Sequence, residues 1–302
     1  MALRGDLQNL KPCLIVRNPA AGRGRALRQW DGIERKLRDT GIDFEEAVTS
    51  RPCEAGEIAQ RESGNYECIV AAGGDGTVHE VVNGLMRAGG RAALGVIPLG
   101  SGDDFAKLLS NGFIFDFSNK KTKTFDVGRI STGSEVRYFA NGMDIGFGAH
   151  GARNVKRVPR FLTGFGAYLG ALLLTMVRYP LLRVRLQLDD APPFEFTTAM
   201  TAAMNGTTFG GSFRVCPEAR PDDGLLDLLL VDAVGRLQIL QLVPKILRGA
   251  HAGDPHLRLV RAKRVTIESD EPLLVEADGE IAFQDARELR IEVLPAALRV
   301  FA

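Results

Sequence analysis

The first 126 residues alternate short apolar runs with segments of helical periodicity. The predicted strands are the apolar runs 13–16, 44–49, 68–72 and 94–99. The predicted helices cover 26–40, 54–63 and 78–87, and a fourth begins near Phe105. Strands that alternate with helices are typical of a parallel sheet whose loops gather at the carboxyl ends of the strands. The pattern therefore predicts an N-terminal, doubly wound α/β domain.

The pattern changes after about Asp126. Runs typical of β-strands cover 136–141, 182–188, 194–205, 225–231, 264–269, 273–277 and 289–293. Helical patterns interrupt them at 154–179 and 237–247. Many short strands separated by turn residues are typical of an antiparallel sandwich or barrel. We predict an α/β nucleotide domain at 1–128 and a β-sandwich domain at 129–302, with an active cleft between them. An alternative for the last strand is that it packs back near the first domain.

Composition places the chain among ordinary globular proteins. It has 302 residues, of which 45% are hydrophobic and 25% are charged. Its 38 Lys and Arg against 37 Asp and Glu leave a net charge of +1. Because nucleic-acid-binding domains are normally strongly basic, no nucleic-acid partner is expected. The four cysteines form no CxxC pair, which favours a reducing, cytoplasmic location, and Cys13 and Cys68 lie within apolar runs and are expected to be buried.

The strongest chemical signal is the segment AAGGDGTVHEV at 71–81, directly after the third predicted strand. Glycines allow the backbone to approach an anion, and the helix that follows directs its N–H groups and its positive dipole end at phosphate. A carboxylate such as Asp75 is repelled by phosphate unless a cation intervenes. Asp75 therefore indicates Mg²⁺ coordination or catalysis, and the alternative is that it only caps the next helix.

Two further strand-to-loop junctions carry similar residues. The segment 17–25 combines glycines with three arginines, and the segment 100–104 combines small residues with two acids. Thr49 ends the second predicted strand. In a parallel sheet all these positions lie at one edge. One nucleotide pocket explains the three junctions better than three unrelated turns that carry such residues by coincidence.

The chain resembles the diacylglycerol kinase catalytic family, which includes bacterial lipid kinases, sphingosine kinases and ceramide kinase. The nucleotide-site motifs are NPAAG at 18–22, GGDGTVHEVVNGL at 73–85 and LGSGDDFA at 99–106. The likeness continues through FDVGRI at 125–130, FANGMDIGFGA at 139–149, PEARPDDGLLDL at 217–228 and VEADGE at 275–280. It therefore covers nearly the whole chain in the family's order.

The resemblance implies ATP-dependent phosphorylation of a lipid hydroxyl. The residues that it places around ATP and its metal are Asn18, Pro19, Ala20, Ala21, Thr49, Gly73, Gly74, Asp75, Gly76, Thr77, Val78, His79, Glu80 and Ser101. Two positions depart from the family, which usually has Asn at Asp103 and often has Asn at His79. Asp103 either tunes the metal affinity or marks a loop that contacts the nucleotide less closely. His79 is either a nucleotide contact or a solvated helix residue without a role.

The turn Asp278-Gly279-Glu280 lies between two predicted strands. Phosphoryl transfer needs a group that accepts the proton of the attacking hydroxyl, and a carboxylate in this turn suits that role. The alternative is a simple hairpin turn, for which Asp-Gly is a favoured pair. The resemblance assigns proton acceptance to Glu280, and Asp278 is a further catalytic candidate from the same turn. Asp75 is the second candidate for the base.

The acidic turn PDDGLLD at 221–227 suits a hard cation, because carboxylates beside carbonyls are typical Mg²⁺ ligands. The resemblance implies a structural Mg²⁺ held by the side chain of Asp223 and the main-chain oxygens of Arg220 and Leu225. An exposed turn without a metal is the alternative.

The uncharged segment 161–177 is shorter than the roughly 20 residues that a membrane span requires. Arg153, Lys156, Arg157 and Arg160 precede it, and basic residues beside an apolar helix favour a peripheral contact with anionic lipid. The alternative is a helix packed across the β domain, which is also our expectation for 237–247. We predict a lipid substrate taken at the membrane surface and leave the oligomeric state open, with a homodimer as one alternative.

Two other functions compete with the lipid kinase. NAD kinases and phosphofructokinases have similar GGDGT loops, so a soluble substrate is one alternative. A nucleotide-binding module without catalysis is the other, although Asp75, Asp223, Asp278 and Glu280 are all present. The residues do not distinguish diacylglycerol from other lipids that carry a hydroxyl group.

Overall fold

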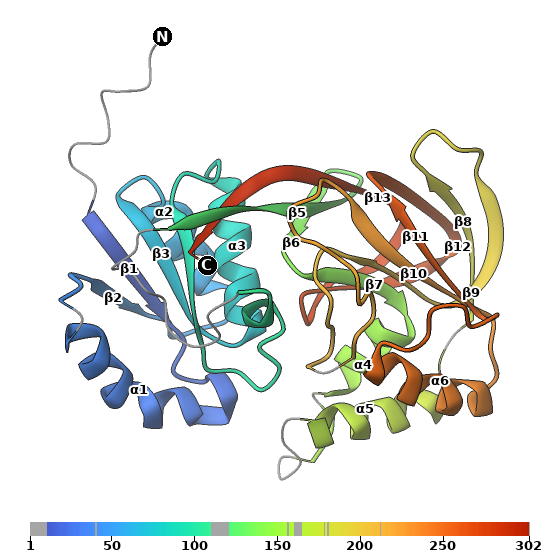
Figure 1. Ribbon diagram of the computed structural model, residues 1–302, viewed down its shortest axis with the longest axis horizontal. Coiled ribbons are helices and arrows are strands. Elements are labelled where there is room, and N and C mark those ends of the chain that lie inside the picture. Colours follow the sequence, from blue (N-terminus) through green and yellow to red (C-terminus); the bar gives the residue numbers. More distant parts are fainter. Residues whose placement is uncertain are drawn as a thin grey trace. The chain divides into compact units, whose positions relative to one another are not determined.

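The computed structural model describes residues 11–39, 41–109, 121–155, 157–159, 165–177, 179, 181–211 and 213–301. The chain divides into two compact units. The first unit comprises Met1–Phe125 together with Ala297–Ala302, and the second comprises Asp126–Ala296. The last residues of the chain therefore belong to the same unit as the first strands (Figure 1).

The first unit contains a parallel sheet. Its strands are β1 (Lys11–Arg17), β2 (Glu45–Val48), β3 (Tyr66–Gly73) and β4 (Ala93–Pro98). They pair in parallel in the order β2-β1-β3-β4, and the end of the long strand β13 (Glu280–Phe301) pairs with β4 through Val300 and Leu94. The parallel pairing agrees with the alternation of apolar runs and helical segments in the sequence.

Helices cover both faces of this sheet. They are α1 (Ala21–Asp39), α2 (Glu54–Glu62) and α3 (Asp75–Arg87). Trp30 and Leu37 of α1 pack in one apolar cluster with Ile15, Val70 and Ile97 of the strands. Neighbouring strand residues point to the opposite face, where α2 and α3 pack against each other and contact β1 and β3 (Figure 1).

Two predicted helices differ from the observed ones. Gly22, Arg23 and Gly24, near the start of α1, have left-handed backbone conformations, and regular helix follows them close to the predicted start at Ala26. At Phe105 the expected helix is a four-residue 3₁₀ turn, Phe105–Leu108, and the continuation at 110–120 lies outside the described residues.

The second unit is built mainly of antiparallel strands. They are β5 (Thr122–Thr132), β6 (Glu135–Phe139), β7 (Gly142–Gly146), β8 (Leu182–Leu188), β9 (Phe194–Met204), β10 (Leu226–Asp232), β11 (Leu257–Ala262), β12 (Arg264–Ala277) and β13. The strand order is β11-β10-β9-β7-β12-β13, and β8 pairs with both β9 and β12. The strands β5, β7 and β11 lie outside the predicted runs. The predicted runs 264–269 and 273–277 form one strand, β12.

Apolar side chains on both faces of β10 explain why this strand is a nearly continuous apolar run. In β10, Leu228 and Leu230 join the cluster that contains Phe139 and Leu186. The alternate residue Leu229 packs on the other face with residues of α5 (Phe165–Val177) and α6 (Arg236–Arg248). A strand buried on both faces has no polar face, so the run carries no alternation.

The predicted helical segment 154–179 is two helices, α4 (Phe147–Val155) and α5. Pro159 follows α4 and cannot donate a backbone hydrogen bond to continue it. Of the uncharged segment 161–177, residues 161–164 lie outside the described residues. Within the described ranges no helix has the length and apolarity needed to cross a bilayer.

Candidate active site

The loops that follow β3 and β4 touch each other through glycines. A Cβ built on Gly74 would lie 2.9 Å from Cα of Gly100, and one built on Gly100 would lie 2.5 Å from Cα of Gly74. The amide of Leu99 donates to the carbonyl of Gly73 at 2.8 Å. Any side chain at Gly74 or Gly100 would push the loops apart, so glycine is needed here for the close approach of two backbones.

The loop after β1 joins the same edge of the sheet. Nδ2 of Asn18 donates to Oγ1 of Thr77 at 3.1 Å, and Oδ1 of Asn18 accepts the amide of Ala20 at 3.0 Å. The amide of Asn18 donates to the carbonyl of Ala72 at 3.0 Å. Asn18 therefore ties the NPAAG loop to the first turn of α3.

The predicted nucleotide residues differ in exposure. Ala20 and Ser101 are exposed, Asn18 and Pro19 are half-buried, and Ala21, Val78 and Thr49 are buried. The amide of Thr49 donates to the carbonyl of Arg17 at 2.9 Å, which aligns the end of β2 with the end of β1. The structure therefore brings the three predicted loops and Thr49 to one edge of the sheet. Their binding to ATP stays a prediction.

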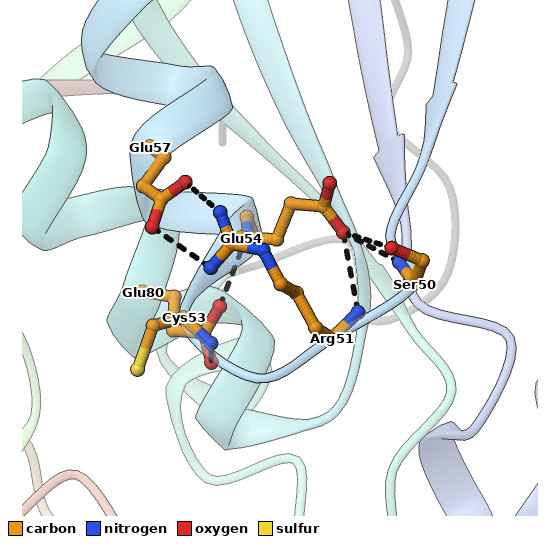
Figure 2. Close-up of polar contacts among 7 residues, drawn as sticks. Ser50, Arg51, Cys53, Glu54, Glu57 and Glu80 are labelled. Carbon is orange, nitrogen blue, oxygen red and sulfur yellow. Dashed lines mark hydrogen bonds and ion pairs between the residues drawn. The ribbon is translucent and has the colours of Figure 1, made fainter.

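The turn after Thr49 is held by carboxylates, as Figure 2 shows. Oε2 of Glu54 accepts the amides of Ser50 at 2.6 Å and of Arg51 at 3.2 Å. Glu80, on α3, accepts the amide of Cys53 on Oε1 at 2.9 Å and the amide of Ala55 on Oε2 at 3.1 Å. Both carboxylate oxygens of Glu80 thus bind the N-terminus of α2, a role that the sequence analysis missed.

His79 is buried, with 8% of its surface exposed, and lies beside Asn83 of the same helix. The alternative of a solvated His79 is therefore wrong. Helix α3 also packs closely against α2, and this contact depends on two glycines. A Cβ on Gly84 would collide with the carbonyl of Gly56, so the two helices pack at backbone distance.

Asp75 is the first residue of α3, and the position before the helix is Gly74. Asp75 is therefore not the cap of α3, which removes that alternative. Its Oδ1 accepts the amide of Phe105 at 3.3 Å. Burial of its carboxyl group, and then the negative charges of Asp104 and Asp103, raise the pKa of Asp75 from 3.8 to about 7. A carboxyl with this pKa exchanges a proton near neutral pH, as a proton acceptor must.

Asp103 closes the loop after β4. It has a left-handed backbone conformation, with φ of 51°, and its Oδ1 accepts the amide of Gly100 at 2.9 Å. Arg25 donates to the carbonyl of Gly100, and its Nη2 lies 4.0 Å from Oδ2 of Asp103. Burial raises the pKa of Asp103. Asp104 pairs with Lys107 at 2.7 Å. Asp103, at the position where the family usually has Asn, therefore holds the loop after β4 through the amide of Gly100.

In the second unit, Asp278 and Gly279 form the hairpin turn between β12 and β13, both with positive φ (49° and 92°). The carboxylate of Asp278 is buried and accepts three amides: Ala140 at 2.9 Å, Asn141 at 2.9 Å and Gly142 at 3.0 Å. Asp278 therefore anchors the turn to the start of β7. Glu280, the first residue of β13, is half-buried beside it.

Two acids that the sequence analysis did not single out lie next to this turn. Asp144 on β7 and Glu276 on β12 face each other in the strand register and are fully buried. Burial raises the pKa of Asp144 to about 7, and burial together with Asp144 raises the pKa of Glu276 well above its usual value. For Glu276 the available signal was an acid within the predicted run 273–277, since a charged residue is rarely buried without a partner.

The predicted metal turn forms one wall of a surface pocket of about 670 Å³. The pocket is lined by Pro217, Glu218, Ala219, Arg220, Asp223 and Arg261. Oδ1 of Asp223 accepts the amide of Leu225 at 3.1 Å, and Oδ2 lies 4.0 Å from Nη1 of Arg261. Asp126 supports the turn by accepting the amide of Gly224 at 2.7 Å.

The described residues include no group of three or more His, Cys, Asp or Glu placed to hold a metal. A cation at the Asp223 turn would therefore depend on one carboxylate and main-chain carbonyls, and would share Asp223 with Arg261. The metal role of Arg220, Asp223 and Leu225 stays a prediction.

Proteins similar in sequence to this chain are named as diacylglycerol kinases or lipid kinases. Residues 12–130 match the family model of the diacylglycerol kinase catalytic domain, and residues 141–302 match that of the YegS C-terminal NAD kinase beta sandwich-like domain. A diacylglycerol kinase of Mycobacterium tuberculosis is 31% identical over 297 residues, which covers 94% of this chain and 92% of that protein. A Pseudomonas aeruginosa protein named "Probable lipid kinase YegS-like" is 31% identical over 274 residues, 87% of this chain and 86% of its own.

A solved diacylglycerol kinase from Bacillus anthracis str. Sterne has the same fold, with a TM-score of 0.73 at 22% identity over 97% of each chain. The two units thus define a kinase-type catalytic domain followed by a β-sandwich-like domain. The chain belongs to the diacylglycerol kinase family, in the group that carries the YegS-type C-terminal domain.

Proposed function

We propose that this protein is an ATP- and Mg²⁺-dependent lipid kinase that phosphorylates the hydroxyl of diacylglycerol or a related lipid. The observation that carries the proposal is the edge of the first unit's sheet, where glycine loops meet at the N-terminus of α3 beside Asp75. The family relationship supports the same activity.

The first unit supplies what a nucleotide needs. Helix α3 begins at Asp75, so the first N–H groups of the helix have no partner within it and are directed toward its N-terminus. Gly74, the residue before the helix, carries no side chain, and Arg25 adds a positive charge nearby. Backbone amides, a helix dipole and an arginine together suit the polyphosphate of ATP.

The carboxylate of Asp75 lies at the same place and is an oxygen ligand suited to Mg²⁺. The negative charges of Asp103 and Asp104 raise the pKa of Asp75. A divalent cation bound beside Asp75 would reduce this repulsion between the carboxylates. The donors are hard oxygens, which Mg²⁺ prefers. We propose that Asp75 holds the metal that accompanies ATP. Bound Mg²⁺ would neutralise charge on the phosphates during transfer.

Two carboxylates are candidates for accepting the proton of the lipid hydroxyl. Glu280 follows a turn that three amides hold rigidly through Asp278, and Asp75 has a pKa suited to proton exchange near neutrality. Both oxygens of Asp278 accept buried amides, so we assign Asp278 to positioning the turn rather than to proton transfer. We propose Glu280 as the base, with Asp75 as the alternative.

We propose a structural Mg²⁺ at Arg220, Asp223 and Leu225. Addition of Mg²⁺ should then stabilise the protein against urea without nucleotide, and Asp223→Ala should abolish that stabilisation. Asp189, an exposed aspartate at another turn, provides the control variant Asp189→Ala, which should respond to Mg²⁺ like the wild type. An equal response of Asp223→Ala would exclude this site.

An apolar surface on α5 and α6 supports lipid contact. Its exposed side chains are Leu169, Leu173, Leu174, Val177, Leu237 and Leu240. The two helices are joined where Arg236 of α6 donates to the carbonyls of Met176 and Val177, each at 2.9 Å. Exposed Arg153 and Arg157 lie in and just after α4, which packs against α5. We propose that this leucine surface rests on anionic membrane when the enzyme takes its lipid.

The deciding experiment incubates the purified chain with labelled ATP, Mg²⁺ and a panel of lipids that carry a hydroxyl group. The panel contains diacylglycerol, phosphatidylglycerol, a sphingoid base, ceramide and a polyprenol, and parallel reactions contain NAD and a sugar phosphate. We expect label in a lipid. Label only in a soluble acceptor would refute the lipid assignment, and ATP binding by calorimetry without transfer to any acceptor would indicate a non-catalytic module.

A further inference from the structure

The buried acids Asp144 and Glu276 connect two parts of the second unit. Oδ2 of Asp144 accepts the amide of Ala149 at 2.9 Å and also bonds to the amide of Gly148, so it binds the N-terminus of α4. A Cβ on Gly148 would collide with this carboxylate, so the contact requires glycine there. Glu276 accepts the amide of Gly279, the residue directly before Glu280. The pair thus lies between α4 and the turn.

One hydrogen bond between the two side chains would satisfy the remaining oxygens of the pair. Oδ1 of Asp144 and Oε2 of Glu276 are buried and contact no hydrogen-bond donor in the described part of the chain. Because Asp144 and Glu276 lie opposite each other in the strand register, these two oxygens are placed to share one hydrogen bond. Two carboxylates cannot make this bond without a proton, because both are acceptors. One shared proton therefore joins β7 to β12 at this point.

The distribution of charge favours the proton on Glu276. The amides of Gly148 and Ala149 and the positive end of the α4 dipole stabilise an ionised Asp144. Asp278, in the same turn, is a further acid that acts on Glu276 and opposes its ionisation. Glu276 then donates its proton to Asp144 through Oε2 while Oε1 continues to accept the amide of Gly279.

We propose that Asp144 and Glu276 are positioning residues that hold Glu280 in place through one shared proton and the amide of Gly279. The proposal rests on the proposed kinase function, in which Glu280 is the base. Loss of the shared proton would place two negative charges side by side in a buried site and push the strands apart at the turn. Glu280 would move with Gly279, and a displacement of about 1 Å at a reacting group can lower a rate about a hundredfold.

The variants Glu276→Ala and Glu276→Gln separate positioning from other roles. Alanine removes the acceptor for Gly279 and the donor for Asp144, so kcat with diacylglycerol micelles and ATP should fall about ten- to a hundredfold, with a KM for ATP within about twofold of wild type. Glutamine keeps both contacts, since its oxygen accepts from Gly279 and its nitrogen donates to Asp144. Glu276→Gln should therefore restore a kcat within about threefold of wild type.

The pH profile supplies a readout that general destabilisation does not produce. The wild-type kcat should decline at alkaline pH as the shared proton leaves, and Glu276→Gln should lack this decline because an amide hydrogen does not dissociate. Asp144→Asn should lack it for the same reason. The control is Asp189→Ala, which removes a carboxylate that accepts the amides of Lys263 and Arg264 at the opposite end of β12. It should keep both kcat and the alkaline decline.

An alkaline decline that persists in Glu276→Gln, or a Glu276→Ala kcat within about twofold of wild type, would overturn the proposal. If Glu276→Ala does not fold, the profile of Glu276→Gln decides alone. A wild type that phosphorylates no lipid would refute the proposed function instead. The pair is then tested by hydrogen exchange at the Gly279 amide, whose protection should fall at alkaline pH in the wild type but not in Glu276→Gln. Equal behaviour of both proteins would overturn the positioning role.

Discussion

Asp75→Asn should abolish lipid phosphorylation and at the same time stabilise the protein. The wild-type carboxylate is buried near two other acids, which is why its pKa rises from 3.8 to about 7. Above pH 7 the folded chain carries a charge that the unfolded chain holds at lower cost. At about 1.36 kcal/mol for each pKa unit, the rise in the pKa of Asp75 sets a ceiling of about 4 kcal/mol on this destabilisation. An asparagine keeps the oxygen that accepts the amide of Phe105 and carries no charge.

The sign of the pH dependence follows from the raised pKa. Between about pH 4 and pH 7 the folded protein binds a proton on Asp75 that the unfolded chain has already released, so wild-type stability declines as pH rises through this window. Asp75→Asn has no such decline. Its advantage in the free energy of unfolding should be near zero at pH 4 and should reach about 1–3 kcal/mol at pH 8.

Urea unfolding at pH 4, 6, 7 and 8, with EDTA and without nucleotide, measures this difference. Asp31→Asn, at an exposed position of α1, is the matched control and should change stability little at any pH. The labelled-ATP assay should show at least about a hundredfold loss for Asp75→Asn. A variant that is no more stable than wild type at pH 8, or whose advantage does not depend on pH, would refute the electrostatic reasoning. Full activity would remove Asp75 from the mechanism.

Three further outcomes follow from the contacts. Asp278→Ala leaves three buried amides without an acceptor and should lower the free energy of unfolding in urea by about 3–5 kcal/mol; a loss below about 1 kcal/mol would contradict the anchoring role. Gly74→Ala places a Cβ 2.9 Å from Cα of Gly100 and should weaken ATP binding in calorimetry about tenfold or more, whereas unchanged affinity would separate these loops from the nucleotide. Leu173→Glu on the leucine surface should reduce co-sedimentation with anionic vesicles about fivefold or more, while Leu259→Glu, at an exposed site on β11, should not; equal effects would exclude the surface.

Elements that depend on local pattern were predictable. The apolar runs of the first unit are its strands, and the helices that follow β1, β2 and β3 return the chain so that the strands pair in parallel. Cys13 and Cys68, expected within apolar runs, are buried and face each other in the register of β1 and β3. The strands β5, β7 and β11 escaped prediction because charged residues or glycines interrupt their apolar positions, and β13 was predicted only at 289–293.

The sequence by itself determined most strands and helices of the first unit, the glycine loops and the choice of Asp75 as a candidate, because periodicity and turn residues act over a few neighbouring positions. Only the tertiary structure decided the roles of Glu80, Asp278 and the pair Asp144 and Glu276. Glu80 binds amides 25 and 27 residues away, and Asp278 binds amides more than 130 residues away. A buried carboxylate can bond to any amide that folding brings within reach, and no local pattern specifies which one that will be.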